Sequence, residues 1–139
     1  FYWGDEHYAL TVGPDRATRM NACRTALDSG VPMAIHSDAP VTPLGPLFTA
    51  WAAINRVTAS GRIQGQEERI QVHEALWAIT MGAAYTLHLD GEIGSIETGK
   101  KADFAVLEAD PTACDPMQLK DIGVWGTVQG GRIFPAAGL

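Results

Sequence analysis

The sequence is poor in cysteine and in basic residues, and these scarcities exclude several classes of protein. Two cysteines, Cys23 and Cys114, occur among 139 residues. They are too far apart, and too far from any histidine at zinc-finger spacing, to predict a disulfide scaffold or a thiolate metal site. Ten Lys and Arg residues against sixteen Asp and Glu residues give a net charge of -6 and a pI near 5.0. The largest basic cluster is the pair Lys100-Lys101, so nucleic acid and anionic lipid are not expected partners.

Long hydrophobic runs are also absent, which argues against a membrane span. The stretch from Val31 to Asn55 is uncharged except for Asp38. Four prolines interrupt it, at Pro32, Pro40, Pro43 and Pro46, whereas a spanning helix needs about 20 predominantly apolar residues. Because 46% of the residues are hydrophobic, the chain can still bury a core. We therefore predict a soluble protein, and the lack of a disulfide framework favours the cytoplasm.

The hydrophobic pattern predicts three helices in the first two thirds of the chain. Gly13-Pro14-Asp15-Arg16 is typical of a helix start and Gly30 of a helix end, so one helix is expected between them. Apolar residues recur at helical spacing from Leu47 to Ala59 and from Val72 to Leu87, which predicts two more helices. Gly82 is expected to cost the third helix roughly 1 kcal/mol relative to alanine.

Short runs of strand-forming residues predict a sheet. The run from Val31 to His36 is apolar and ends in a proline turn, as in a strand buried on both faces of a parallel sheet. Three later runs, Phe104–Leu107, Val124–Val128 and Arg132–Phe134, also read as strands, and Gly130-Gly131 is a typical hairpin connector. The expected fold class is therefore α/β.

The segment IHSDAP, residues 35–40, joins the end of an apolar run to two chemically active side chains. Side chains at the carboxyl ends of parallel strands form the active sites of α/β proteins. Asp38 is therefore a candidate to bind a divalent metal ion or to take a proton from water. The alternative is that Asp38 caps the turn before Pro40 by accepting backbone hydrogen bonds. The His-x-Asp spacing of His36 and Asp38 is weak evidence by itself and favours the turn.

Four longer stretches resemble the carboxyl-terminal part of metal-dependent amidohydrolases, specifically amidohydrolase family 3. They read FYWGDEH, GPDRATRMNACRTALDSGVP, HSDAPVTPLGPL and ALWAITMGAAYTLHLDGEIGSIETGKKADFAVLEADP. The most specific combination is Ser37-Asp38-Ala39-Pro40 followed by the run from Gly94 to Phe104, which has the pattern GxIxxGKxADF. The resemblance covers nearly all of the 139 residues.

The resemblance implies a fold, a reaction and a cofactor. Residues 1–90 are expected to form the C-terminal part of a (β/α)₈ TIM barrel, and residues 91–139 to form strands of a small β-sandwich. Asp38 matches an Asp that ends the last barrel strand and faces the metal centre, as a catalytic and metal-binding residue. The implied activity is hydrolysis of the C–N bond of a small amide-type substrate by water activated on a divalent metal ion, expected to be zinc.

The histidines are less informative than Asp38. His7 is expected to line a substrate pocket, with an exposed loop histidine as the alternative. His36 matches no metal ligand and is predicted to be a buried strand histidine that is satisfied by nearby backbone. His73 and His88 are expected at the surface or at a helix boundary.

Several other residues are expected to have structural roles. Three tryptophans are predicted to fill the core or an interface: Trp51, Trp77 and Trp125. Lys100 and Lys101 are expected to be solvated charges, and Asp103 is expected to fix the turn before the next strand.

The sequence lacks the His-x-His pair and the further histidines that such a metal centre needs. We therefore expect a fragment that is missing the N-terminal part of the same enzyme, and that alone neither binds zinc tightly nor hydrolyses a substrate. Uncovered apolar faces and unpaired strand edges predict a homo-oligomer. The alternative is a non-enzymatic α/β binding or assembly module that keeps the folding pattern without the chemistry.

Overall fold

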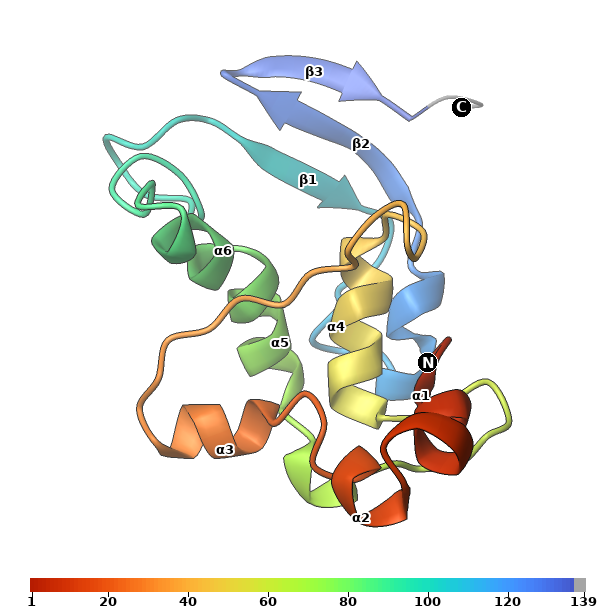
Figure 1. The fold of residues 1–139 in the computed structure, drawn as a ribbon. Coiled ribbons are helices and arrows are strands. Elements are labelled where there is room, and N and C mark those ends of the chain that lie inside the picture. The colour runs from red at the N-terminus through yellow and green to blue at the C-terminus, as the bar shows by residue number, and fades with distance from the viewer. Residues whose placement is uncertain (137–139) are drawn as a thin grey trace.

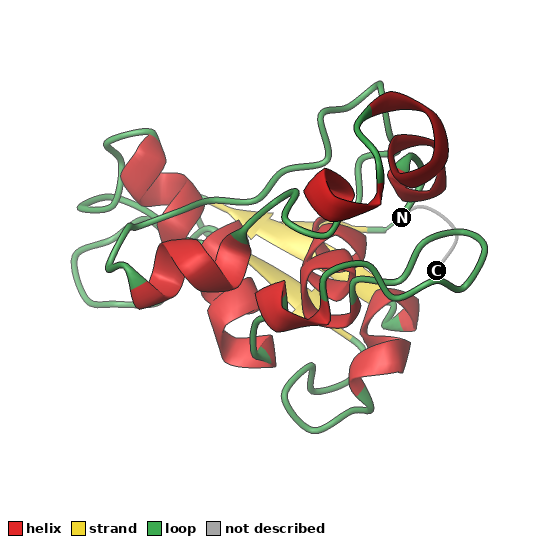
Figure 2. Cartoon of the chain, turned by 60° about the horizontal axis from the view of Figure 1, so that its bottom comes forward, coloured by secondary structure: helices red, strands yellow, loops and turns green. Residues whose placement is uncertain are grey.

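The computed structural model describes residues 1–136 as a group of short helices with a small sheet on one side (Figure 1). Seen from the end opposite the sheet, the helices lie in front of the strands (Figure 2). This arrangement of helices and a three-stranded sheet is the predicted α/β class. None of the helices in residues 1–136 is both long enough and apolar enough to cross a bilayer.

The elements follow one another in a simple order. The helical elements are α1 (Gly4–Glu6), a π-helical turn η1 (His7–Thr11), α2 (Pro14–Ala17), α3 (Cys23–Asp28), α4 (Pro46–Asn55), η2 (Gln66–Glu68), α5 (Val72–Ile79), α6 (Met81–Thr86) and η3 (Pro116–Asp121). The strands are β1 (Phe104–Leu107), β2 (Val124–Gln129) and β3 (Arg132–Pro135).

The single helix predicted between Gly13 and Gly30 is wrong, because the structure has two. Asn21, between α2 and α3, has a φ of 52°, a left-handed conformation that a right-handed helix cannot contain. The predicted end at Gly30 is confirmed. Gly30 has a φ of 70°, and the Val31 N–H donates to the Ala26 carbonyl at 2.9 Å, which is the usual glycine termination of a helix.

The other two predicted helices are shorter than the pattern indicates. α4 ends at Asn55 because Arg56 has a φ of 54°. The helix predicted from Val72 to Leu87 is divided at Thr80, whose φ and ψ of -122° and -89° lie outside the helical region. The Thr80 hydroxyl donates to the Leu76 carbonyl at 2.7 Å, a bond that competes with the helical ladder.

The centre of the core lies where α4 packs against α5 and η3. Trp51 and Leu119 are almost completely buried, at 2% and 0% exposure. The Trp51 Nε1–H donates to the Met117 carbonyl at 2.9 Å, and Asn55 Nδ2 donates to the Pro116 carbonyl at 2.9 Å. These bonds satisfy two carbonyls of η3 within the core, so the tail of the chain is held onto α4 by both packing and hydrogen bonds.

The predicted core or interface role is confirmed for Trp51, and a place at an interface stays a prediction for Trp77 and Trp125. Trp51 is core, but Trp77 and Trp125 are each 39% exposed. Trp77 lies on α5 and Trp125 lies on β2. Both side chains are exposed because a helix or a strand at a protein surface leaves one face uncovered.

The three predicted strands are confirmed, and they form an antiparallel sheet in the order β1-β2-β3. Gly130 and Gly131 connect β2 to β3 with φ values of 55° and 79°, as the predicted hairpin requires. The Asp103 carboxylate accepts a hydrogen bond from the Gly130 N–H at 2.6 Å. Asp103 was predicted to fix the local turn before β1. The structure shows that its side chain also holds the β2–β3 hairpin turn against the start of β1.

The loop before β1 is pinned to α6 by Lys100. Its side chain is only 10% exposed, and Nζ donates to Ser95 Oγ at 2.6 Å and lies 3.6 Å from Met81 Sδ. The expectation of a solvated charge is therefore wrong for Lys100, because the chain folds back over its side chain. It is confirmed for Lys101, which is exposed and pairs with Glu92 at 2.7 Å.

The strand predicted at residues 31–36 is wrong. Residues 31–38 form neither helix nor strand, and they run as a single trace from α3 toward α4 (Figure 1). A strand requires a neighbour for its backbone hydrogen bonds, and the three strands of residues 1–136 pair with one another. The apolar pattern is still used, because Met33 and Ile35 pack against the core. The TIM barrel stays a prediction, as does the division into residues 1–90 and 91–139.

Candidate functional site

Asp38 lies exposed in the connection between α3 and α4, at the end of the segment 31–38. Its φ of 54° is left-handed, a conformation that Asp adopts more readily than most residues. Its carbonyl accepts a hydrogen bond from the Val41 N–H at 2.8 Å, and its N–H donates to His36 Nδ1 at 3.0 Å. The turn is therefore closed by the backbone of Asp38.

The side chain of Asp38 is not used to cap this turn. Within residues 1–136 its carboxylate accepts no hydrogen bond and forms no ion pair, whereas two other aspartates cap their turns. Asp110 Oδ1 accepts from the Thr112 N–H at 2.8 Å, and Asp115 Oδ1 accepts from the Met117 N–H at 2.9 Å. The turn-capping interpretation thus fits Asp110 and Asp115, and the carboxylate of Asp38 is available to a ligand or a proton.

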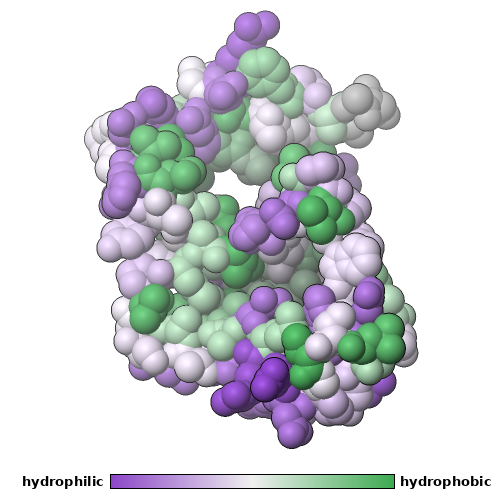
Figure 3. Space-filling view, viewed as in Figure 1, coloured by the Kyte–Doolittle hydropathy of each residue, from purple (hydrophilic) through white to green (hydrophobic). Residues whose placement is uncertain are grey.

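A cavity of about 590 Å³ lies beside the segment 31–38, which ends at Asp38. It is lined by the N-terminal residues, by residues 20–23, by residues 33–37 and by one face of α4. Its aromatic lining comes from Phe1, Tyr2, Trp3 and Phe48. In the space-filling view the molecule is hollowed near its middle, where apolar residues in green lie beside polar residues in purple (Figure 3). Ser37 and His36 line the cavity and connect it to Asp38.

His7 lines the same cavity. It is half-buried at the start of η1, and its Nδ1 lies 2.8 Å from Thr11 Oγ1. The exposed-loop alternative for His7 is therefore wrong, because the residue is helical and partly covered. A contact between His7 and a substrate stays a prediction.

The other histidines occupy different environments. His36 is exposed, so its predicted burial is wrong, because no neighbouring strand covers it. Its predicted backbone partner is confirmed, since His36 Nδ1 accepts the Asp38 N–H. His73 and His88 are exposed, as predicted.

Sequence reasoning missed Asp5, which ties the N-terminal segment to the loop after α4. Its carboxylate accepts hydrogen bonds from Ser60 Oγ at 2.7 Å, Thr58 Oγ1 at 2.9 Å and the Ser60 N–H at 3.0 Å, and Arg62 Nε lies at 3.4 Å. These donors, the Ser60 hydroxyl first, lower the pKa of Asp5 to about 2 because they stabilise the charged form. Asp5 and Ser60 are 55 residues apart, so no local pattern reveals the contact.

The described residues do not form a metal centre by themselves. Residues 1–136 contain no group of three or more His, Cys, Asp or Glu side chains placed to hold a metal ion. Asp38 offers one carboxylate, and the Nδ1 atom of its neighbour His36 is occupied by a backbone N–H. A catalytic zinc ion takes three protein ligands, so any metal bound near Asp38 needs further ligands.

Comparison with known proteins gives consistent results along the whole chain. The model of the amidohydrolase family matches residues 1–135. The Bacillus subtilis protein YtcJ is 34% identical over 125 residues, which are 88% of this chain and 24% of YtcJ. The N-substituted formamide deformylase of Arthrobacter pascens is 31% identical over 127 residues, which are 91% of this chain and 23% of the deformylase.

A solved structure agrees with these sequence matches. The crystal structure of an amidohydrolase from Thermotoga maritima has a TM-score of 0.62 and 25% identity, over 82% of this chain and 26% of that chain. The chain thus spans about a quarter of the length of these relatives. Because the family model spans residues 1–135 of the 139, the chain belongs to the amidohydrolase family.

Proposed function

We propose that this chain contributes Asp38 to the active site of an enzyme that hydrolyses the C–N bond of small amide-type substrates. The observation that carries the proposal is an uncommitted carboxylate in a left-handed turn, within a chain that matches the amidohydrolase family over residues 1–135. The Arthrobacter relative is named for the deformylation of N-substituted formamides, which supports an amide C–N bond as the target.

The proposed role of Asp38 is to move one proton. Its carboxylate accepts a proton from the attacking water while the water oxygen bonds to the carbonyl carbon. The same proton then passes to the nitrogen as the C–N bond breaks, so the products are a carboxylic acid and an amine, and the carboxylate is regenerated. A positioned group of this kind contributes about 10²–10⁴-fold to a rate. His7 and the aromatic side chains of the neighbouring cavity are proposed to contact the substrate.

We further propose that the complete active site contains a divalent metal ion, expected to be zinc, inside a TIM barrel. Asp38 is the candidate ligand in this chain, and the remaining ligands are proposed to come from other segments, since the relatives are about four times as long. Such an ion lowers the pKa of bound water toward neutrality.

The test compares two aspartate variants of the complete protein that contains this chain. Amine release from a panel of formamides and other amides is measured for the wild type, Asp38→Asn and Asp15→Asn. Asn tolerates the left-handed backbone at position 38, so the fold is expected to persist. Asp15, an exposed residue in the first turn of α2, is the matched control. We expect kcat to fall by about 10²–10⁴-fold for Asp38→Asn and to stay unchanged for Asp15→Asn. Equal activity of all three proteins would contradict the role of Asp38.

A further inference from the structure

The segment from Ser29 to Asp38 carries the proposed catalytic carboxylate but has no strand or helix of its own. Without a ladder of backbone hydrogen bonds, its place depends on the elements that hold it. Met33 and Ile35 pack against the core, and two further contacts hold the segment: one at α3, directly before it, and one at α6, where it passes Met33.

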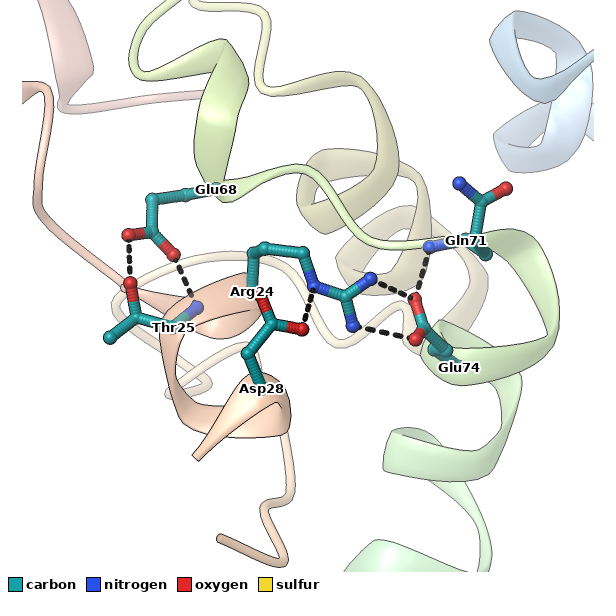
Figure 4. A network of polar contacts seen from close by, with 6 residues as sticks. All are labelled: Arg24, Thr25, Asp28, Glu68, Gln71 and Glu74. Carbon is teal, nitrogen blue, oxygen red and sulfur yellow. Dashed lines mark hydrogen bonds and ion pairs between the residues drawn. The ribbon is translucent and has the colours of Figure 1, made fainter. Parts of the chain in front are cut away.

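The first contact joins α3 to two glutamates from later elements (Figure 4). Arg24 binds Glu74 through both arms of its guanidinium, with Nη2 to Oε1 at 2.6 Å and Nη1 to Oε2 at 3.2 Å. The Thr25 N–H and hydroxyl donate to the two oxygens of Glu68, at 2.9 Å and 2.5 Å. We name these four residues, Arg24, Thr25, Glu68 and Glu74, the α3 clamp.

The α3 clamp is partly shielded from solvent: Glu68 is buried, Arg24 and Glu74 are half-buried, and Thr25 is exposed. Glu68 is 7% exposed, and the side chains of Arg24 and Glu74 are 27% and 21% exposed. A two-armed pair between Arg and a carboxylate fixes orientation as well as distance. Glu74 Oε2 also accepts the Gln71 N–H at 2.7 Å, so the carboxylate that holds α3 is itself held at the first turn of α5.

The second contact is at Gly82 of α6. A Cβ atom on Gly82 would lie 2.3 Å from the Met33 carbonyl oxygen and 2.8 Å from Cζ3 of Trp77. Both distances are shorter than non-bonded atoms allow, so any side chain at position 82 would push the Met33 backbone away from α6. Gly82 was expected to weaken its helix. Its missing side chain allows the segment from Ser29 to Asp38 to lie directly against α6.

We propose that Arg24, Glu74 and Gly82 are positioning residues for Asp38, an assignment that rests on the proposed function. The α3 clamp sets where the segment begins, and Gly82 sets how closely its middle approaches α6. Loosening either contact lets the Asp38 carboxylate move relative to a bound substrate. A displacement of about 1 Å is enough to cost on the order of 10²-fold in rate.

Two conservative variants of the complete protein test this proposal. Glu74→Gln removes the charge that Arg24 binds but keeps the capping interaction with Gln71, because Gln serves as well as Glu at this helix position. Gly82→Ala adds one methyl group in a helix that prefers alanine. The matched controls are Glu92→Gln, which breaks the exposed ion pair with Lys101, and Gly91→Ala, whose Cβ would have nothing within 4 Å.

Amide hydrogen exchange and steady-state kinetics are measured on all four variants. We expect the hydrogen-bonded amides of this segment, those of Ser29, Gly30, Val31 and Asp38, to exchange about tenfold faster or more in Glu74→Gln and Gly82→Ala, with β1, β2 and β3 unchanged. We expect kcat to fall by about 10–100-fold with little change in KM, and both controls to behave as wild type. A purely structural weakening would instead raise exchange throughout the molecule.

Two results would overturn the proposal. Unchanged exchange in residues 29–38 would show that these contacts do not hold the segment. Faster exchange with unchanged kcat would show that its placement does not matter to Asp38. If the wild type hydrolyses no amide, the proposed function fails, while faster local exchange in both variants still supports the anchoring of the segment.

Discussion

Two regions of the molecule differ in what stabilises them. One is the contact between α4 and η3, and the other is the segment from Ser29 to Asp38. The first is a packed core, with Trp51 and Leu119 buried and two side-chain hydrogen bonds to η3 carbonyls. The second is irregular and largely exposed. Its Met33 and Ile35 pack against the core, and the α3 clamp and the close approach at Gly82 hold it further. The difference shows that the residues that stabilise this chain and the carboxylate proposed for catalysis occupy separate regions. Such separation is common, since connecting segments on a rigid scaffold carry much of protein function.

The largest expected effect on stability comes from removing a buried side chain from the contact between α4 and η3. Trp51→Ala removes a side chain that is 2% exposed and deprives the Met117 carbonyl of its donor. We expect the free energy of unfolding to fall by about 3–5 kcal/mol, measured by urea denaturation. Trp125→Ala removes the same side chain at 39% exposure and is expected to cost less than about half as much. Equal losses would mean that this contact is not the main core.

A smaller and local effect is expected from acid. Hydrogen bonds from Thr25 lower the pKa of Glu68, and hydrogen bonding to Arg24 lowers the pKa of Glu74. A carboxyl group with a lowered folded pKa stabilises the fold above its ordinary value of about 4.5 and loses this contribution as the pH falls through the folded value. The positive charges of Arg56 near Glu68 and His73 near Glu74 act in the same direction.

Hydrogen exchange between pH 6 and pH 3, corrected for intrinsic rates, measures this loosening. We expect the hydrogen-bonded amides of Ser29, Gly30, Val31 and Asp38 to lose protection below about pH 4.5, before β1, β2 and β3 do. Asp5, with a pKa of about 2, keeps its charge over this range and is expected to keep the N-terminal segment in place. Simultaneous loss of protection in all three regions would contradict a separate α3 clamp.

The smallest effect on stability is expected at Asp38 itself. Asp38→Asn is expected to change the free energy of unfolding by less than about 0.5 kcal/mol, because the residue is exposed and its backbone closes the turn. Asp38→Val places a β-branched residue at a φ of 54° and is expected to cost about 1–2 kcal/mol. Urea denaturation distinguishes the two. A loss above about 1 kcal/mol for Asp38→Asn would assign its carboxylate a structural role.

The features that were predicted correctly depend on short stretches of chain. β1 was expected at Phe104–Leu107 and is found there, and the hairpin at Gly130-Gly131 and the helix end at Gly30 follow from the positive φ values that glycine permits. Asp38 was singled out because it follows an apolar run. Its local environment, with a free carboxylate and a backbone-closed turn, required the folded chain.

The predictions that failed depend on partners elsewhere in the chain. The run from Val31 to His36 has a strand pattern, but a strand is a pairing of two segments, and periodicity does not reveal whether a second one lies beside it. The helix breaks at Asn21 and Thr80 do not occur at a glycine or a proline, so the sequence does not indicate them. Lys100 looked like a surface charge because the sequence does not show that Met81, 19 residues away on α6, lies beside it.

The hydrophobic pattern of the sequence was thus enough to indicate the α/β class, and its resemblance to amidohydrolase family 3 was enough to indicate the family and the residue proposed to move the proton. The fold was needed for the α3 clamp, for the anchoring of Asp5 and for the close approach of Met33 to Gly82. The physical reason is distance along the chain. Arg24 and Glu74 are 50 residues apart and Asp5 and Ser60 are 55 apart. Such contacts arise only when the packing of the core has brought their elements together.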